Sequence, residues 1–182
     1  MAKIRNYLIL LGGAGVVVAL DQWSKYLVSS RLEVGQTWMP IPWLAPYARI
    51  IHWSNTGAAF GLFPSGSLIF TIVAVIVSAA ILYYFPRVPA NQIALRVALA
   101  MQLGGAIGNL IDRVVHGTVI DFISLGTFPV FNLADSSISV GLAVLVAAMW
   151  LEERHAKAGS KGELSPPVEG DEGGSHAEHP LG

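Results

Sequence analysis

Two aspartates, Asp121 and Asp135, stand out because each lies at the edge of a long apolar segment in a chain with few acids in its middle. Between residues 34 and 151 the only other acidic residue is Asp112. An ionised carboxylate at or near membrane hydrocarbon is costly, so acids there commonly serve a function. Two carboxyl groups that lie close together share one proton. One can then deprotonate a water while the other donates to a substrate carbonyl, so the pair indicates carboxyl chemistry at a membrane surface.

Each aspartate taken alone has a plainer explanation. Asp121 follows a His-Gly pair and could be a turn or capping residue. Asp135 lies three residues after Asn132, which is the spacing of a helix N-cap and an acid in the first turn. A helix N-terminus favours negative charge, so we expect Asp135 to hold the charge more of the time, within a pair that titrates as a unit. The short segment between the aspartates permits their contact but does not require it.

Two further polar motifs lie in the first half of the chain. In the first, Asp21 and Lys25 are four residues apart and share a face if the helix continues. Its alternative role is an ion pair that ends a membrane span at the interface. In the second, the Asn55 side chain can bond an extended peptide, and Gly57 lets another backbone come close. Its alternative role is a turn that leads into the next apolar segment.

The last motif covers residues 104–113. Gly104 and Gly108 form a GxxxG pattern, whose ordinary role is the close packing of membrane helices. That role does not explain the polar group that follows at the same end, which includes Asn109 and Arg113. The arginine is a natural partner for a peptide carbonyl or a lipid oxygen.

The elements that must position these residues are membrane helices. The chain is 53% hydrophobic and 13% charged, whereas soluble domains average about 25% charged residues. A helix needs about 20 residues to cross the hydrocarbon, and lipid leaves backbone groups no partner outside a helix or a closed barrel. We therefore predict an all-α membrane protein, a four-transmembrane-helix bundle with a small extracytoplasmic β-rich subdomain. The spans are predicted at residues 4–23, 67–85, 92–111 and 136–151.

The flanking Lys and Arg residues favour a topology with both termini in the cytoplasm. Residues 25–66 and 112–134 then face outside, and residues 49–53 have the β-branched and aromatic character of a strand. A membrane domain is expected over residues 1–155. Residues 156–182 are rich in Gly, Pro, Ser and Glu and are predicted to be a disordered cytoplasmic tail. The basic, apolar N-terminus also resembles a cleaved signal peptide, but an uncleaved first span is favoured.

Composition and missing motifs remove several classes of function. There is no cysteine, so thiol catalysis, disulfides and thiolate metal sites are excluded. A net charge of -1 predicts no nucleic-acid partner. The zinc HExxH, serine-elbow and Walker motifs are missing, so we expect no metal and no cofactor. An alternative from another class is a small proton-coupled transporter that uses the aspartates as a relay, although a relay favours acids near the middle of its spans.

Together the motifs resemble those of the lipoprotein signal peptidases, the type II signal peptidases of bacteria. The resemblance covers Asp21 to Ser136. The family's catalytic pair lies in its V-x-D-F and F-N-x-A-D-S motifs, which implies Asp121 and Asp135 as catalytic residues. The implied binding and supporting residues are Asp21, Lys25, Asn55, Gly57, Gly108, Asn109, Arg113 and Asn132.

The resemblance also implies a substrate and a location. The substrate is a prolipoprotein whose cysteine already carries a diacylglyceryl group, and cleavage falls just before that cysteine. The enzyme would lie in the bacterial inner membrane, in contact with lipid, with its active site at the outer face. The family is the target of the cyclic peptide globomycin. A monomer is the expected oligomeric state.

Overall fold

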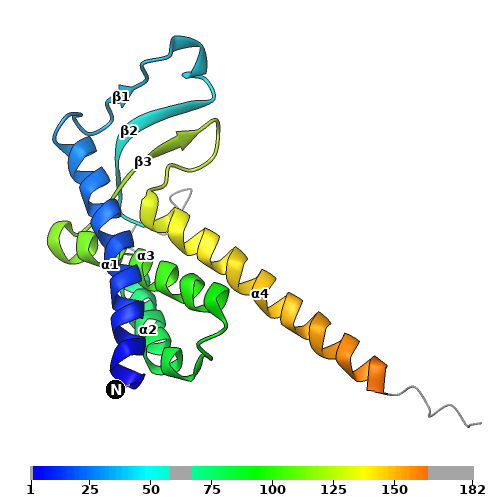
Figure 1. The fold of residues 1–182 in the computed structure, drawn as a ribbon. Coiled ribbons are helices and arrows are strands. Elements are labelled where there is room, and N and C mark those ends of the chain that lie inside the picture. The colour runs from blue at the N-terminus through cyan, green and yellow to red at the C-terminus, as the bar shows by residue number, and fades with distance from the viewer. Residues whose placement is uncertain (1, 58–66, 164–182) are drawn as a thin grey trace, which may run out of the picture. The chain divides into compact units, whose positions relative to one another are not determined.

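The computed structural model describes residues 2–57 and 67–163, and the chain divides into two compact units, Met1–Met149 and Trp150–Gly182. Every candidate residue lies in the first unit. The elements in chain order are α1 (Ala2–Ser29), β1 (Thr37–Trp38), η1 (Pro42–Leu44), β2 (Ala48–Asn55), α2 (Ser67–Tyr84), η3 (Phe85–Arg87), α3 (Ile93–His116), β3 (Val119–Leu125) and α4 (Leu133–Glu163) (Figure 1).

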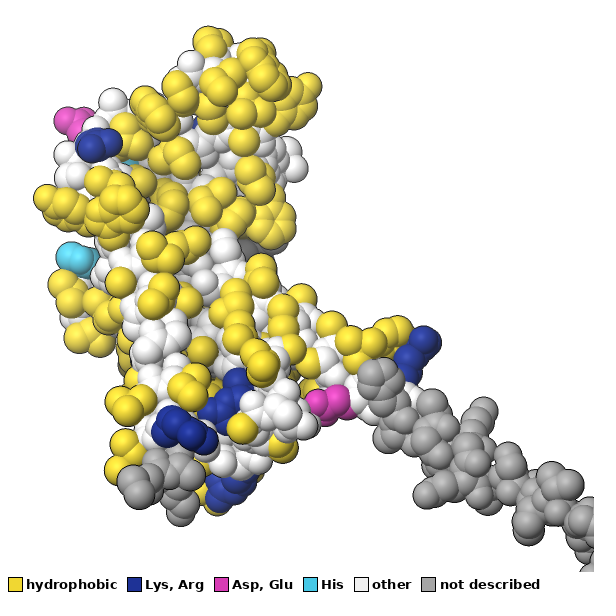
Figure 2. Space-filling model, in the orientation of Figure 1, with side chains coloured by type: hydrophobic (Ala, Val, Ile, Leu, Met, Phe, Trp, Pro, Cys, Tyr) yellow, Lys and Arg dark blue, Asp and Glu magenta, His cyan; other side chains and the backbone are white. Residues whose placement is uncertain are grey.

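Four of these helices are long and apolar enough to cross a membrane, so the chain is a multi-pass membrane protein. The spans are Ile4–Ser29, Ser67–Arg87, Ile93–His116 and Leu133–Arg154. Large apolar side chains cover much of the helix surface in Figure 2. In a membrane protein this surface faces lipid, which explains why so many such side chains are exposed in the isolated chain.

The helices extend beyond three of the predicted spans. Because α1 continues to Ser29, Asp21 and Lys25 share a helix face. Because α3 continues to His116, Asp112 and Arg113 are helical rather than part of a loop. It ends where Gly117 takes a left-handed conformation (φ 75°) and its N–H bonds the Arg113 carbonyl.

At the other end of the chain, α4 is helical through residues 156–163, which the composition assigned to the disordered tail. The remainder of that predicted tail, residues 164–182, lies outside the described residues.

Helix α3 is the centre of the bundle. Half of its span is buried, compared with 17% of α1 and 11% of α2. The core around it contains Leu10, Phe85 and Leu103. A Cβ at Gly104 would lie 2.6 Å from the Val17 Cβ of α1, so the GxxxG glycines allow close helix packing within one chain.

Helix α4 packs against α3 at another glycine. A Cβ at Gly105 would lie 2.5 Å from the Ala134 carbonyl oxygen, so a larger residue would push the start of α4 away. The first turn of α4, which carries Asp135, is therefore held directly against α3.

The three strands form one antiparallel sheet in the order β1-β2-β3, as Figure 1 shows. The strand predicted at residues 49–53 is confirmed as part of β2. Strand β3 was not predicted, because its polar and apolar residues looked like a turn next to a glycine. It pairs with β2 so that Asp121 lies opposite Trp53 and Val119 lies opposite Asn55. This register brings the motif of Asn55 and Gly57 close to Asp121.

Candidate active site

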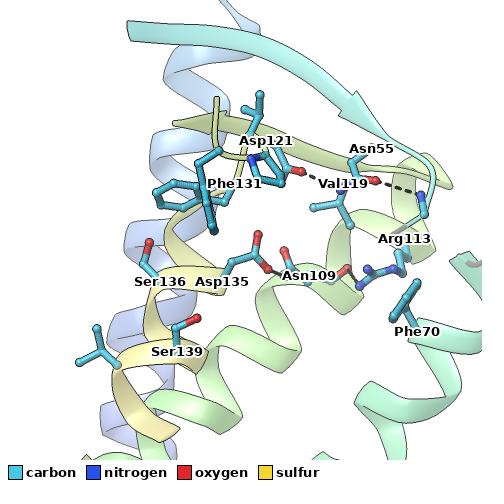
Figure 3. Close-up of a pocket in the computed structure, with 15 residues that line it drawn as sticks. Asn55, Phe70, Asn109, Arg113, Val119, Asp121, Phe131, Asp135, Ser136 and Ser139 are labelled. Carbon is cyan, nitrogen blue, oxygen red and sulfur yellow. Dashed lines mark hydrogen bonds between the residues drawn. The ribbon is translucent and has the colours of Figure 1, made fainter. Parts of the chain in front are cut away.

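Asp121 and Asp135 line one pocket of about 650 Å³, which lies where the sheet meets α3 and α4 (Figure 3). Asp121 is in β3, whose side chains alternate between the two faces of the sheet. Val119 and Asp121 therefore both line this pocket, whereas Phe122 lines a separate cavity. Asp121 is thus a strand residue, not the turn or capping residue that was its alternative reading, and it is only 1% exposed.

Asp135 lies in the first turn of α4 and takes part in the cap of that helix. The Asn132 side-chain oxygen accepts a hydrogen bond from the Asp135 backbone N–H at 2.9 Å. In return, the Asn132 backbone N–H donates to Asp135 Oδ2 at 3.3 Å. This reciprocal arrangement is a capping box. It confirms the predicted N-cap and fixes the carboxylate at the positive end of the helix dipole.

Asn132 also binds the other aspartate, so one residue donates to both carboxyl groups, through its backbone to Asp135 and through its side chain to Asp121. It is fully buried, and its Nδ2 donates to Asp121 Oδ1 at 2.7 Å and to Asn109 Oδ1 at 3.0 Å. Each aspartate has a second amide donor. Asn109 Nδ2 donates to Asp135 Oδ1 at 2.7 Å, and Asn55 Nδ2 donates to Asp121 Oδ2 at 2.8 Å.

Behind this layer lies a buried group of three charges, in which Lys25 binds two carboxylates. Lys25 Nζ lies 2.7 Å from Asp21 Oδ2 and 2.8 Å from Asp112 Oδ2, and all three side chains are at most 2% exposed. The ammonium also donates to Asn109 Oδ1 at 3.1 Å. Unpaired charges at this depth would be very costly, so their mutual pairing explains why they are tolerated.

The same carboxylates hold the ends of the elements that carry the catalytic candidates. Asp21 Oδ1 accepts from the backbone N–H of Ala134, in the first turn of α4, at 2.9 Å. Asp112 Oδ2 accepts from the backbone N–H of Ile120, next to Asp121 in β3, at 3.1 Å. The buried charges therefore position α4 and β3 relative to α1 and α3.

The other predicted residues have distinct positions. Gly108 packs against this group, since a Cβ there would lie 2.6 Å from Asp21 Oδ2. Gly57 lines the pocket, and its N–H bonds the Asn55 side-chain oxygen at 2.9 Å. Arg113 also lines the pocket, and one guanidinium N–H donates a hydrogen bond to the backbone carbonyl of Asn109. The motif that contains Asn55 and Gly57 continues through residues 58–61, which lie outside the described residues.

Burial, and after it the nearby charge of Asp135, raise the pKa of Asp121 from its ordinary value to about 7. The hydrogen bonds from Asn55 and Asn132 and the charge of Lys25 act in the opposite direction. A carboxyl with this pKa is substantially protonated at neutral pH, so it can serve as a proton donor.

Sequence reasoning left Asp112 and Gln22 out of the candidate set. Gln22 Nε2 donates to Asp112 Oδ1 at 2.9 Å and to the Gly108 carbonyl at 3.1 Å. Both residues lie inside the motifs already recognised. The sequence does contain a signal for these two residues. Polar residues gather at the end of the first apolar segment and at the end of the third, which suggests that these two helix ends lie together in the fold.

The fold and the pocket define a class: a multi-pass membrane protein in which a small sheet and the end of a helical bundle hold two carboxyl groups in one pocket. Comparison with known proteins narrows this class. Residues 13–151 match the family model described as Signal peptidase (SPase) II. The lipoprotein signal peptidase of Halalkalibacterium halodurans is 40% identical over 146 residues, which is 78% of this chain and 92% of the relative. That of Mesorhizobium japonicum is 43% identical over 134 residues, covering 71% and 77% respectively.

Solved structures agree with this assignment. A bacterial membrane enzyme determined by the in meso method at 2.3 Å resolution has a TM-score of 0.72 and 29% identity, covering 88% of this chain and 94% of that one. A second bacterial membrane enzyme, determined at 1.9 Å resolution, has a TM-score of 0.68 and 33% identity, covering 77% and 91%. The chain belongs to the signal peptidase II family. It is therefore a membrane peptidase, and the transporter alternative is wrong.

Proposed function

We propose that this chain is an aspartic endopeptidase that removes the signal peptide from diacylglyceryl-modified prolipoproteins, cleaving just before the lipidated cysteine. The observation that carries the proposal is that Asp121 and Asp135 line one pocket and that both carboxyl groups accept hydrogen bonds from the same buried residue, Asn132. The relatives' name, lipoprotein signal peptidase, supports the substrate class.

In this mechanism Asp135 acts as the base and Asp121 as the acid. Ionised Asp135, at the helix N-terminus, takes a proton from a water, whose oxygen attacks the scissile carbonyl carbon. Protonated Asp121 donates its proton to the carbonyl oxygen as the tetrahedral intermediate forms. When the intermediate collapses, the C–N bond breaks and the proton held by Asp135 passes to the leaving cysteine amine. One hydroxyl of the intermediate returns its proton to Asp121 as the C=O bond re-forms, which restores the starting state of the pair. No metal or cofactor takes part in these steps.

The remaining candidates divide into two roles. Asn55, Gly57 and Arg113 line the open pocket and offer hydrogen bonds or close approach to the extended peptide around the scissile bond. Another set of buried or closely packed residues positions the catalytic pair: Asp21, Lys25, Gly108, Asn109 and Asn132.

The substrate's lipid anchor requires an active site at the edge of the bilayer. We place the sheet and the pocket at the outer face of the bacterial inner membrane and both termini in the cytoplasm. Positively charged side chains support this orientation. Arg96 binds Asn6 at the end of the bundle opposite the sheet, and Lys and Arg side chains gather at that end in Figure 2. We also propose a monomer in contact with lipid, because α1 of the same chain already packs against the GxxxG glycines.

The test uses purified full-length protein in detergent with a synthetic diacylglyceryl-modified prolipoprotein peptide. We expect mass spectrometry to find a product whose new N-terminus is the lipidated cysteine, with or without EDTA. The unlipidated peptide should be cleaved poorly or not at all. Cleavage at another bond, or equal cleavage of both peptides, would contradict the proposed substrate, and loss of cleavage in EDTA would contradict the metal-independent mechanism.

A further inference from the structure

A second groove of about 240 Å³ continues from the active-site pocket between the membrane helices. It shares Phe70, Asn109, Arg113 and Asp135 with that pocket, so the two cavities meet at the proposed catalytic group. Beyond the shared residues its walls are almost entirely apolar. They are formed by Val73, Ala74, Val77, Ala106 and Ile138.

Gln102 is the polar exception in this wall. Its Nε2 is buried and has no hydrogen-bond partner, a condition found at one other side-chain atom among the described residues, Ser78 Oγ. The serine hydroxyl can rotate toward the carbonyl of the preceding helical turn. The Gln102 amide lies on a longer stem, which packs over Gly141 of α4, where a Cβ would meet Gln102 Cγ at 3.1 Å. The stem is thus held between α3 and α4, with its amide in the wall of the groove.

An unpaired amide in an apolar membrane groove is costly, and buried polar groups nearly always have a partner. The missing partner must be an acceptor, since the unpaired atom is an N–H donor. Lipid chains themselves offer no acceptor. A carbonyl oxygen on a bound molecule that enters from the active-site pocket would supply one.

The distance from the catalytic group identifies which carbonyl this is. Gln102 lies about two helical turns before Asn109 on α3, so the two are about 10 Å apart along the helix axis. In a lipidated prolipoprotein, about eight bonds join the scissile carbon to an ester carbonyl carbon through the cysteine side chain and the glycerol. In an extended chain, bonds of ordinary length span on the order of 10 Å over that path.

We propose that Gln102 donates a hydrogen bond to an ester carbonyl of the substrate's diacylglyceryl group and so determines specificity for lipidated substrates. The inference rests on the proposed function, and it adds the residue that recognises the lipid. The groove then holds the glycerol and the first part of an acyl chain while the scissile bond lies between Asp121 and Asp135. An unlipidated peptide leaves this donor unpaired and loses the contact.

The experiment compares two substrates that differ only in the ester carbonyls: the diacylglyceryl peptide and its dialkyl ether analogue. Gln102→Met keeps the side-chain length but removes the donor. We expect Gln102→Met to lower kcat/KM for the ester substrate about 10-fold. We expect the ether substrate to be cleaved about 10-fold more slowly by the wild-type chain, with no further loss in the variant. Gln92→Met, at the start of the same helix and outside the groove, should match wild type with both substrates.

Three results would overturn the proposal. The first is an unchanged kcat/KM for Gln102→Met on the ester substrate. The second is an equal loss on both substrates, which would assign the donor to a peptide carbonyl or to packing. The third is equal wild-type cleavage of ester and ether substrates, which is decisive even if Gln102→Met folds poorly. If wild type cleaves neither substrate, the proposed function fails; if it cleaves both equally, only the lipid contact fails.

Discussion

At the scale of residues, amide side chains define the geometry of the acids. Asn132 contacts both aspartates, and Asn109 and Asn55 each add a donor to one of them. Donors of this kind stabilise carboxylate charge, while burial opposes it. The balance leaves Asp121 with a pKa of about 7, in the range where a carboxyl can work as an acid at neutral pH.

Replacing Asn55 with alanine should therefore move the pH profile in a defined direction. The Asn55 hydrogen bond lowers the pKa of Asp121, so its loss raises that pKa above about 7. Asp121 acts in its protonated form, so activity is present below this pKa and is lost as pH rises through it. We expect the alkaline limb of the kcat profile of Asn55→Ala to lie at higher pH than in wild type.

The control for this profile is Ser54→Ala in the same strand, since the exposed Ser54 donates its hydroxyl hydrogen bond to Thr118 and not to an aspartate. Its alkaline limb should coincide with that of wild type. A limb that moves to lower pH in Asn55→Ala would assign the essential protonated group to another residue.

The identities of most candidate residues could be predicted from the sequence, because their motifs are compact and polar in apolar surroundings. The role of Asp112 could not. Its partners are Lys25 and Gln22 on α1, which are distant in sequence, and the Ile120 N–H on β3, a strand that was not predicted. Only the packed fold shows that the Lys25 ammonium binds two carboxylates there.

At the scale of elements, the apolar runs locate the helices but not their ends. Helix α1 continues past its predicted end because Asp21 and Lys25 pair along it, and α3 continues to Gly117. Strand β3 is formed by pairing with β2, so its local sequence alone resembles a turn. An ion pair within a helix, a glycine cap and strand pairing decide these boundaries, and hydropathy records none of them.

Gly105→Ala tests the contact between α3 and α4. The new methyl group would lie 2.5 Å from the Ala134 carbonyl oxygen, so the start of α4 must move. We expect overpacking to cost about 1–3 kcal/mol. Because Asp135 lies in the same turn as Ala134, activity should fall as well. Thermal unfolding in detergent and the cleavage assay measure the two effects.

Gly12→Ala is the matched control, because a Cβ at Gly12 of α1 meets nothing within 4 Å. Alanine is favoured over glycine in a helix by up to about 1 kcal/mol. Stability should be unchanged or slightly higher. If both glycine variants behave alike, the close approach of α4 to α3 has no energetic importance.

At the scale of the whole molecule, four apolar helices and one small sheet place two carboxyl groups where a membrane-anchored peptide can reach them. The helices provide lipid-facing surface and a tight centre at α3. The sheet contributes Asp121, and the first turn of α4 contributes Asp135. The fold class could be predicted from composition and from the resemblance, whereas the joining of residues from both segments between the spans in one sheet required the structure.

The central claim is that Asp121 and Asp135 together carry out peptide hydrolysis, and cleavage of a diacylglyceryl prolipoprotein by Asp121→Asn and Asp135→Asn tests it most directly. Glu33→Gln, an exposed acid outside the pocket, is the control. We predict that each aspartate variant loses about 10²–10⁴-fold in kcat while its unfolding temperature stays near that of wild type, and that Glu33→Gln is fully active. Wild-type cleavage by either aspartate variant would contradict the account.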